Sequence, residues 1–306
     1  MQNRREFLKT GAKFALASSF FSLNDLSLFA NDTKEIKMPK LKLNNGLDMP
    51  LLGFGTYQIS SNEAQRCVED AISVGYRLID TAQYYQNESE VGAGVKTAIK
   101  GGFKREKFFI TTKIAPKDYE DTKRAIELSL KRLDVSYIDL LLIHWQSPNA
   151  EAMWRAFEEA YDAGLIKSLG VSNFSREIFS DFIKKVRIKP VLNQLETHIF
   201  FQRTEYQSFL EQNGIKLQAW SPFAQGKNNF FKNEILSKIA TKHGKSTAQI
   251  ALKFLAQRGV SVIPKTSKRQ RMIENISIFD FELDREDLSL ISSLDTKKSA
   301  FGWFEG

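Results

Sequence analysis

An aspartate and a tyrosine lie five residues apart at the end of a short apolar run. Asp80 follows Arg77-Leu78-Ile79, Tyr85 lies in the connection beyond it, and a helical pattern runs from Glu90 onward. A short apolar run that leads into a helical pattern is typical of a parallel βα unit. We therefore predict that both side chains belong to one strand-to-helix connection.

Two further apolar runs end in reactive side chains. Lys113 closes the run 108–113, and His144 closes the run that begins at residue 138. A tyrosine has a pKa near 10 and is a poor proton donor at neutral pH. An ammonium within about 4–6 Å stabilises the phenolate and lowers that pKa, and a paired aspartate such as Asp80 keeps the lysine charged.

These four side chains together predict a proton-transfer site. Histidine adds a hydrogen-bond donor that can orient a carbonyl oxygen. The set fits protonation of a carbonyl oxygen while a hydride reaches its carbon. Each residue also has a structural explanation: Asp80 as a helix N-cap, Tyr85 as a packing residue, His144 as a satisfied buried histidine. Lys113 is harder to explain, since lysine is rarely buried without a partner.

The composition limits the function classes. The 306 residues are 42% hydrophobic and 26% charged, as in soluble globular proteins. The single cysteine, Cys67, excludes an internal disulfide framework and a cysteine-based metal cage. Three widely spaced histidines give no metal-ligand pattern, so we expect no metal. The net charge of +8 is scattered, so we expect no nucleic-acid partner.

Residues 1–30 resemble an export signal. Arg4-Arg5 precede an apolar stretch over residues 14–23, and small residues continue to Ala30. The stretch is too short for a membrane span, and the arginine pair followed by Phe-Leu-Lys resembles a twin-arginine signal. We expect a signal peptide over 1–30, recognised by the twin-arginine translocation machinery, and a periplasmic protein exported in the folded state. An amphipathic helix that stays on the protein is the alternative.

The chain from residue 31 to residue 306 is predicted to be one barrel domain. Asn44-Asn45-Gly46 between two short runs predicts a β-hairpin. Helical segments then alternate with eight strand-like runs, near 51–54, 77–80, 108–113, 138–143, 166–171, 191–195, 216–220 and 260–263.

Eight such units without a Gly-x-Gly-x-x-Gly motif favour an α/β fold of the (β/α)8 TIM barrel type over an open doubly wound sheet. The hairpin would cap the barrel bottom, and residues 284–294 would form an extra outer helix. In a parallel barrel the C-terminal strand ends open on one face. The four candidate side chains can therefore converge there.

Several short motifs occur in order between about residues 40 and 295. They are Leu52-Gly53-Phe54-Gly55-Thr56, Ile79-Asp80-Thr81-Ala82 with Tyr85 and Asn87-Glu88, Thr112-Lys113, Ile143-His144-Trp145, Gly170-Val171-Ser172-Asn173-Phe174, Asn193-Gln194, Ser221-Pro222 and Ile263-Pro264-Lys265. This set resembles the signatures of the aldo-keto reductases. The resemblance implies that Tyr85 is the general acid, that Lys113 and Asp80 tune it, and that His144 orients the carbonyl.

The same resemblance implies an NADP(H) site. Ser172, Asn173 and Gln194 would hold the nicotinamide carboxamide, and Trp220 beside Ser221 would stack on the ring. Lys265 and Arg271 match positions that grip a 2′-phosphate, and the segment between them, with Thr266, offers amides and basic side chains that can cradle a phosphate. Glu274 and Asn275 match the adenine-binding positions.

Aromatic residues predict a pocket for a small carbonyl substrate. They are Tyr57, Trp145, Phe223, Phe301 and Trp303. The chain departs from the family pattern at Gln86, Gln146 and Ile199, which bears on loop shape and substrate.

We expect NADPH-dependent reduction of small aldehydes or ketones. A redox sensor or interaction protein that binds NADPH with little turnover is the alternative. The sequence leaves the substrate and the direction of reaction open. A monomer without a stable membrane span is expected.

Overall fold

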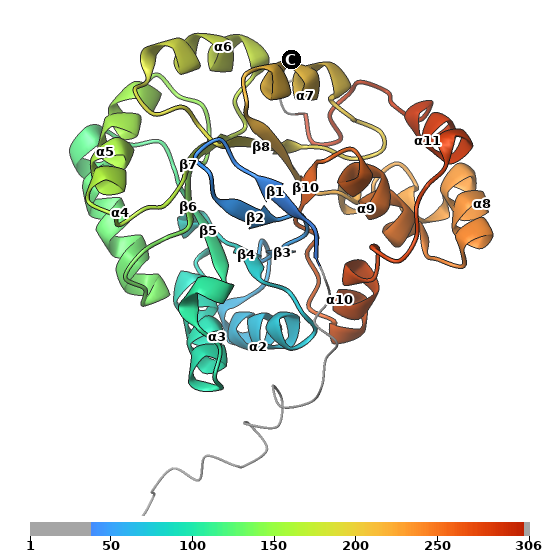
Figure 1. Cartoon of the computed structure of the whole chain (residues 1–306), viewed down its shortest axis with the longest axis horizontal. Coiled ribbons are helices and arrows are strands. Elements are labelled where there is room, and N and C mark those ends of the chain that lie inside the picture. Colours follow the sequence, from blue (N-terminus) through green and yellow to red (C-terminus); the bar gives the residue numbers. More distant parts are fainter. Residues whose placement is uncertain (1–37, 303–306) are drawn as a thin grey trace, which may run out of the picture. The chain divides into compact units, whose positions relative to one another are not determined.

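The computed structural model describes residues 38–302, and the (β/α)8 prediction is confirmed for this part of the chain (Figure 1). The predicted signal peptide and Trp303 lie outside the described residues. The central sheet is parallel and has the strand order β10-β9-β8-β7-β6-β5-β4-β3. Its strands are β3 (Phe54–Gly55), β4 (Leu78–Asp80), β5 (Phe109–Ile114), β6 (Leu140–Ile143), β7 (Leu169–Ser172), β8 (Leu192–Glu196), β9 (Lys216–Trp220) and β10 (Ser261–Val262).

The two edges of this sheet meet and close the barrel. Leu52 forms a parallel bridge with Val262. The amide of Gly53 donates to the Val262 carbonyl at 2.8 Å, and the amide of Val262 donates to the Leu51 carbonyl at 3.0 Å. Within residues 38–302 the central eight-stranded sheet therefore has no open edge for pairing with another chain.

Helices surround the barrel, and their first turns are held by side chains. Asp118 accepts a hydrogen bond from the Asp121 amide at 2.7 Å, and Ser246 and Asp284 begin helices with capping boxes. The helices are α2 (Ser61–Ser73), α3 (Glu88–Lys100), α4 (Tyr119–Leu133), α5 (Ala150–Asp162), α6 (Arg176–Lys185), α7 (Thr204–Gln212), α8 (Glu234–His243), α9 (Thr247–Gln257), α10 (Arg269–Ile276) and α11 (Arg285–Ser292). Helix α11 is the predicted extra outer helix, whereas α8 is an additional helix that the sequence analysis did not separate.

The predicted hairpin crosses the bottom of the barrel. Strands β1 (Lys40–Lys42) and β2 (Asp48–Pro50) pair antiparallel and lie across the barrel in Figure 1. Asn44 donates from Nδ2 to the Pro190 carbonyl at 2.8 Å, just before β8, and Leu43 and Met49 join the apolar cluster of the barrel interior. Because these contacts are made at the N-terminal strand ends, the hairpin closes the end opposite the predicted site.

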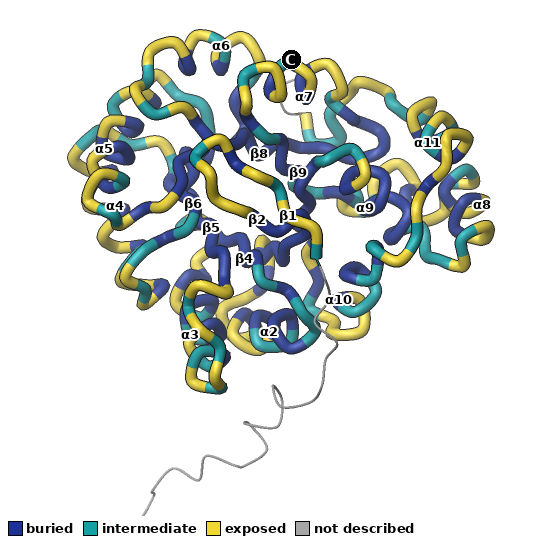
Figure 2. Tube along the Cα trace, in the orientation of Figure 1, coloured by how far each residue is buried: buried dark blue, intermediate teal, exposed yellow. Residues whose placement is uncertain are grey.

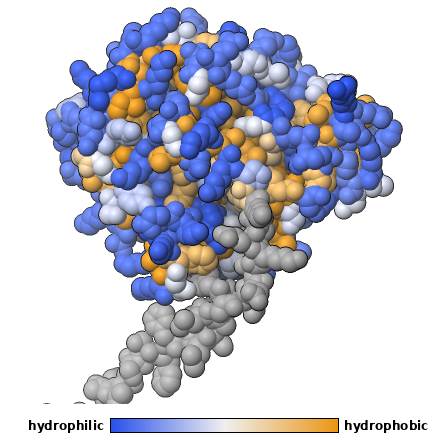
Figure 3. Space-filling view, viewed as in Figure 1, coloured by the Kyte–Doolittle hydropathy of each residue, from blue (hydrophilic) through white to orange (hydrophobic). Residues whose placement is uncertain are grey.

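Burial follows the layers of the fold. The barrel strands are dark and the outer sides of the helices are exposed in Figure 2. The face that carries the hairpin is mostly hydrophilic, with hydrophobic side chains in small scattered groups (Figure 3). Within residues 38–302 no helix combines the length and apolar character that crossing a membrane requires.

Candidate active site

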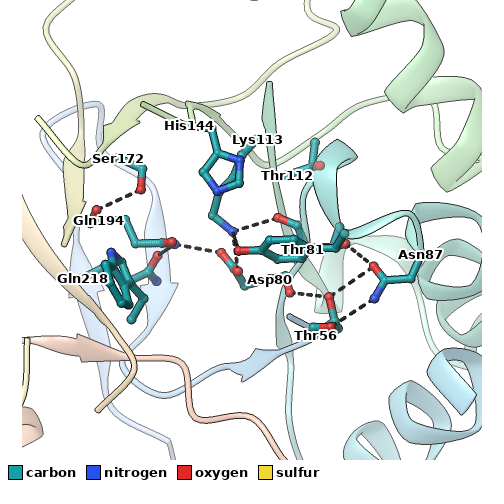
Figure 4. Close-up of polar contacts among 12 residues, drawn as sticks. Thr56, Asp80, Thr81, Asn87, Thr112, Lys113, His144, Ser172, Gln194 and Gln218 are labelled. Atoms are coloured by element: carbon teal, nitrogen blue, oxygen red, sulfur yellow. Dashed lines mark hydrogen bonds and ion pairs between the residues drawn. The ribbon is translucent and has the colours of Figure 1, made fainter. Parts of the chain in front are cut away.

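A buried ion pair lies next to a tyrosine hydroxyl at the C-terminal end of the barrel. Lys113 Nζ donates to Asp80 Oδ1 at 2.6 Å and lies 3.2 Å from the Tyr85 hydroxyl. Asp80 ends β4, Lys113 is the second-last residue of β5, and Tyr85 ends the 3₁₀ turn η1 (Gln83–Tyr85). Figure 4 shows Asp80, Lys113 and His144 around one space. The four predicted residues do converge, as the strand-end argument required.

Burial decides the charge states of this cluster. Burial disfavours the charge of Lys113, but Asp80 and Tyr85 together, through their charges and hydrogen bonds, outweigh it, so the pKa of Lys113 rises above its usual value. Burial also raises the pKa of Tyr85, and the Lys113 ammonium offsets only part of that rise. The ammonium therefore lowers the pKa of this phenol, as expected, but desolvation is the larger effect and the net shift is upward. The phenol keeps its proton at neutral pH, which is the state that a proton donor needs.

His144 follows β6 directly and is a neutral imidazole. Burial, with a smaller contribution from the Lys113 ammonium, lowers the pKa of His144 to about 3. Its ring lies 5.8 Å from the ring of Tyr85, centroid to centroid, and its Nδ1 is buried without a hydrogen-bond partner among the described residues. A neutral ring beside the phenol can orient a carbonyl oxygen without adding a second positive charge.

A row of amides ties the ion pair to the other half of the barrel. Gln194 Nε2 donates to Asp80 Oδ2 at 2.8 Å and to Gln218 Oε1 at 2.7 Å (Figure 4). Gln218 Nε2 in turn donates to Ser261 Oγ at 3.0 Å. Both amide hydrogens of the Gln194 side chain are thus used in hydrogen bonds to other side chains. Its Oε1 is the side-chain polar atom that these two hydrogen bonds leave for another partner. The sequence analysis did not identify Gln218, although a glutamine inside an apolar strand is an unusual choice that signals an interior polar contact.

Asn87 fixes the loops around Tyr85. Its Nδ2 donates to the carbonyls of Thr56 and Ile59, both at 3.0 Å, and its Oδ1 accepts from the Thr81 hydroxyl at 2.8 Å. The loop that it holds carries Tyr57, whose ring lies 5.0 Å from the Tyr85 ring. Asn87 is fully buried. The position of the Tyr85 phenol therefore depends on these hydrogen bonds of Asn87 as well as on packing.

Gln86, which departs from the family pattern, has a left-handed backbone. Its φ is 56° and its ψ is 30°, and its side chain is exposed. For an L residue other than glycine this conformation costs about 1–2 kcal/mol. The strain lies directly beside the proposed acid, Tyr85.

We expect Gln86→Gly to stabilise the folded protein by up to ~1 kcal/mol, because glycine adopts this conformation without strain but loses more chain entropy on folding. Urea unfolding of the two proteins measures the difference. The matched control is Ser89→Gly, an exposed position with a right-handed backbone in the first turn of α3, which should destabilise by at most about 0.5 kcal/mol. Destabilisation by Gln86→Gly would show that the side chain, not the backbone strain, governs this turn.

A cavity of about 1280 Å³ opens from the catalytic cluster. All predicted cofactor residues line it. They are Ser172, Asn173, Gln194, Trp220, Ser221, Lys265, Thr266, Arg271, Glu274 and Asn275. Of the catalytic residues, Asp80, Tyr85 and His144 also line the cavity, whereas Lys113 lies behind them with no exposed surface. One continuous space therefore reaches from the phenol to the segment after β10.

The far end of this cavity is basic. Lys265 and Arg271 flank the start of α10, and both side chains are exposed. Arg269 lies 3.9 Å from Asp70, but neither Lys265 nor Arg271 forms a salt bridge within residues 38–302. Two cations without a carboxylate partner beside a helix N-terminus favour an anionic group such as a phosphate.

Aromatic side chains surround the catalytic end. Tyr57, Trp145 and Phe223 line the cavity as predicted, and Phe301 does so from the C-terminal part of the chain. Tyr84 was not identified from the sequence. It lines the same cavity, its side chain is 72% exposed, and its ring stands edge-on to His144. Tyr84 directly precedes Tyr85 in the sequence, and this proximity to the predicted acid could have identified it as a residue of the site.

The proton-transfer residues and the predicted cofactor residues lie in different halves of the barrel. The proton-transfer cluster comes from β4, β5 and β6 with the segments that follow them. The predicted cofactor residues come from β7, β8, β9 and the segment after β10. Two hydrogen bonds join the halves at the site: Gln194 to Asp80, and Asn173 Nδ2 to the His144 carbonyl at 3.0 Å.

Known proteins resemble this chain over most of its length. The profile of the Aldo/keto reductase family matches residues 51–296. The glyoxal reductase of Bacillus subtilis is 44% identical over 259 residues, which cover 83% of this chain and 92% of the relative. The methylglyoxal reductase DkgA of Escherichia coli K12 is 38% identical over 261 residues, covering 84% and 94%.

Solved structures agree with this result. An aldo-keto reductase from a Medee basin deep-sea metagenome, MGS-M4, has a TM-score of 0.82 at 40% identity and covers 84% of this chain and 96% of its own. A Bombyx mori aldo-keto reductase in complex with NADP has a TM-score of 0.82 at 32% identity, covering 87% and 95%. The chain is therefore an oxidoreductase that acts on carbonyl groups, and it belongs to the aldo/keto reductase family.

Proposed function

We propose that the protein reduces small aldehydes or ketones to alcohols with NADPH, and that Tyr85 is the general acid. The observation that carries the proposal is the Tyr85 hydroxyl 3.2 Å from an ammonium that is itself paired with Asp80, at the inner end of the long cavity. When bound, the nucleotide supplies the hydride for the carbonyl carbon.

The side chains of this cluster then have distinct tasks. Tyr85 gives its proton to the carbonyl oxygen, and the Lys113 ammonium stabilises the phenolate that remains until solvent reprotonates it. Asp80 and Gln194 keep that ammonium in place. Neutral His144 orients the carbonyl. The reverse reaction uses the same groups, with Tyr85 phenolate as the base.

Preference for NADPH over NADH is supported by the basic end of the cavity. Lys265 and Arg271 have no salt-bridge partner among the described residues. The similar Bombyx mori structure was solved with NADP. A 2′-phosphate would satisfy both cations, whereas the 2′-hydroxyl of NADH would leave them without an anion.

We expect Arg271→Ala to weaken NADPH binding about 10–100-fold, because a charge-assisted contact with a phosphate contributes about 1.5–3 kcal/mol. Binding of NADH should change by less than about twofold. Fluorescence titration of both nucleotides gives the comparison, and Arg269→Ala is the control, since Arg269 is engaged toward Asp70. Equal losses for both nucleotides would remove the assignment of Arg271 to the 2′-phosphate.

The substrate is proposed to be small and uncharged. Tyr57, Tyr84 and Trp145 form an aromatic wall that supplies no ammonium or carboxylate. Relatives are named for reduction of glyoxal and methylglyoxal, so dicarbonyls are the first compounds to test. A panel of small aldehydes, ketones and dicarbonyls, followed by NADPH oxidation, tests the activity.

The alternative is an NADPH-binding sensor or interaction protein with little turnover. It would be favoured if NADPH bound tightly but no compound of the panel was reduced. The intact proton-transfer cluster supports the enzyme instead, since nucleotide binding alone requires no buried lysine–aspartate pair beside a tyrosine.

Export by the twin-arginine machinery stays a prediction from residues 1–30, which lie outside the described residues. We propose that the folded protein crosses the membrane with its nucleotide already bound. Periplasmic protein that carries no nucleotide and binds none tightly would contradict this. Replacement of Arg4-Arg5 by lysines should leave the protein in the cytoplasmic fraction.

A further inference from the structure

The last described residues run across the catalytic end of the barrel. The segment Ser299–Phe301, which we call the C-terminal segment, reaches the cavity wall through Phe301. The chain before it is fastened to the loop after β8, since Thr296 donates from both its amide and its hydroxyl to the Phe200 carbonyl. The hydrogen bonds of Thr296 therefore fix the position from which the C-terminal segment enters the cavity wall.

Glu196 holds this segment. Its carboxylate is 1% exposed and, within residues 38–302, accepts hydrogen bonds from the Ser299 hydroxyl at 2.5 Å, from the Ala300 amide at 2.7 Å and from His198 Nε2 at 3.0 Å. The Phe200 amide donates to His198 Nδ1 at 3.2 Å, so the proton of a neutral ring lies on Nε2, toward Glu196.

The Glu196 carboxylate stays charged despite its burial. Burial alone would raise the pKa of Glu196, but the hydrogen bonds from His198, Ser299 and Ala300 outweigh it and lower the pKa. Hydrogen bonds to a charged, buried acceptor are among the stronger ones in proteins. Two of the three donors belong to the C-terminal segment, so much of what stabilises this charge is the segment itself.

The C-terminal segment packs against Trp220, whose ring is proposed to stack on the nicotinamide. Glu196 and Trp220 are register partners at the ends of β8 and β9. The Phe301 ring lies 5.4 Å from the Trp220 ring, centroid to centroid. Lys227 donates to the Ala300 carbonyl at 2.7 Å and lies 4.4 Å from the centroid of the Phe301 ring. Ala300 is thus bound through its amide by the Glu196 side chain at the end of β8 and through its carbonyl by Lys227 in the loop after β9.

The other edge of Trp220 is also fixed. Trp220 Nε1 donates to Asn173 Oδ1 at 2.8 Å, and Asn173 donates to the His144 carbonyl. The indole is therefore oriented from one side by an amide of the catalytic region and packed from the other by the C-terminal segment.

We propose that Glu196 is a positioning residue that controls nucleotide release: it anchors the C-terminal segment so that Phe301 backs Trp220 and closes one side of the cavity. This inference rests on the proposed function, because it takes the nucleotide to occupy this cavity. Glu196 itself does not line the cavity, so it acts through the segment.

The test is a double-mutant cycle on NADPH dissociation. Glu196→Ala and Phe301→Ala are each expected to release NADPH about tenfold faster in stopped-flow displacement, with a smaller effect on association. The double variant should release it no faster than either single variant, because both changes free the same segment. Glu196→Gln, which keeps an acceptor for the Ala300 amide, should lie between Glu196→Ala and the unchanged protein.

Additive effects in the double variant, or an unchanged dissociation rate in Glu196→Ala, would overturn the proposal. A change confined to the KM of the carbonyl substrate would do the same. If Glu196→Ala does not fold, Ser299→Ala replaces it in the cycle with Phe301→Ala. Ser299→Ala removes only one of the hydrogen bonds to Glu196, so it should increase the dissociation rate of NADPH less than Glu196→Ala would.

A nucleotide-free measurement separates this proposal from the proposed function. Lys297 and Lys298 are exposed just before the segment. Trypsin should therefore cut there several-fold faster in Glu196→Ala than in the unchanged protein, because cleavage requires the segment to detach. Failure of the unchanged protein to bind NADPH would overturn the proposed function, and with it the role of Glu196 in nucleotide release. Equal cleavage rates would instead overturn the anchoring role of Glu196 and leave the proposed function untouched.

Discussion

Tyr85→Phe is expected to lower kcat for carbonyl reduction about 10²–10⁴-fold, the range that a positioned general acid contributes. Phenylalanine keeps the ring against Tyr57 and His144 but removes the hydroxyl that lies 3.2 Å from Lys113. NADPH affinity should stay within about twofold, because the predicted nucleotide contacts lie on other residues. Steady-state oxidation of NADPH and a binding titration on the same preparation give both values.

The control for this experiment is Tyr84→Phe. Tyr84 directly precedes Tyr85 and lines the same cavity, but no lysine of the described residues hydrogen-bonds to its hydroxyl, so kcat should be nearly unchanged. Equal losses in the two variants would mean that the pocket needs its hydroxyls for substrate binding, and Tyr85 would lose its role as the acid. Turnover by neither the unchanged protein nor the variants, with NADPH still bound, would favour the sensor alternative.

Lys113→Met is expected to abolish measurable turnover and to lower the free energy of unfolding by about 3–5 kcal/mol, because it leaves the Asp80 carboxylate buried without its cation. The pair is 2.6 Å apart and fully enclosed. Urea unfolding monitored by tryptophan fluorescence measures the loss of stability.

The pH dependence of that loss follows from burial, which raises the pKa of Asp80. Without the opposing ammonium the folded state takes up a proton more readily than the unfolded state, so the deficit should shrink from pH 8 to pH 5. The double variant Asp80→Asn/Lys113→Met should recover much of the stability but none of the activity. A double variant as unstable as Lys113→Met would show that packing of the lysine chain, not its charge, is what the fold needs.

Much of the architecture could be predicted because it is local. Apolar runs of strand length alternate with helical periodicity, so the ends of β4 and β5 lie within one residue of the predicted runs. In the same way, Asn44-Asn45-Gly46 marks the hairpin turn between β1 and β2. The convergence of Asp80, Lys113 and His144 follows from one topological rule, that parallel strands end on the same face.

The remaining features depend on contacts between distant parts of the chain. Gln194 and Asp80 are 114 residues apart, and Ala300 and Glu196 are 104 apart, so no local pattern pairs them. The direction of the Tyr85 pKa shift also required the structure, because it depends on how burial weighs against one ammonium. The division of the helical region before β10 into α8 and α9 was missed for another reason: Gly244 and Ser246 separate two short helices within one apolar pattern.

The separation of proton chemistry and nucleotide recognition between two halves of the barrel bears on how such enzymes can be recombined. A chimaera joined within α5, between β6 and β7, would take Asp80, Lys113 and His144 from one parent and Gln194 and Arg271 from the other. Its two parents would have to agree at the seam on the Gln194–Asp80 and Asn173–His144 contacts, on the β6–β7 pairing and on the Leu52–Val262 bridge that closes the barrel. On the proposed function, such a chimaera would exchange the residues proposed to set nucleotide preference while keeping the proposed acid, Tyr85, unchanged.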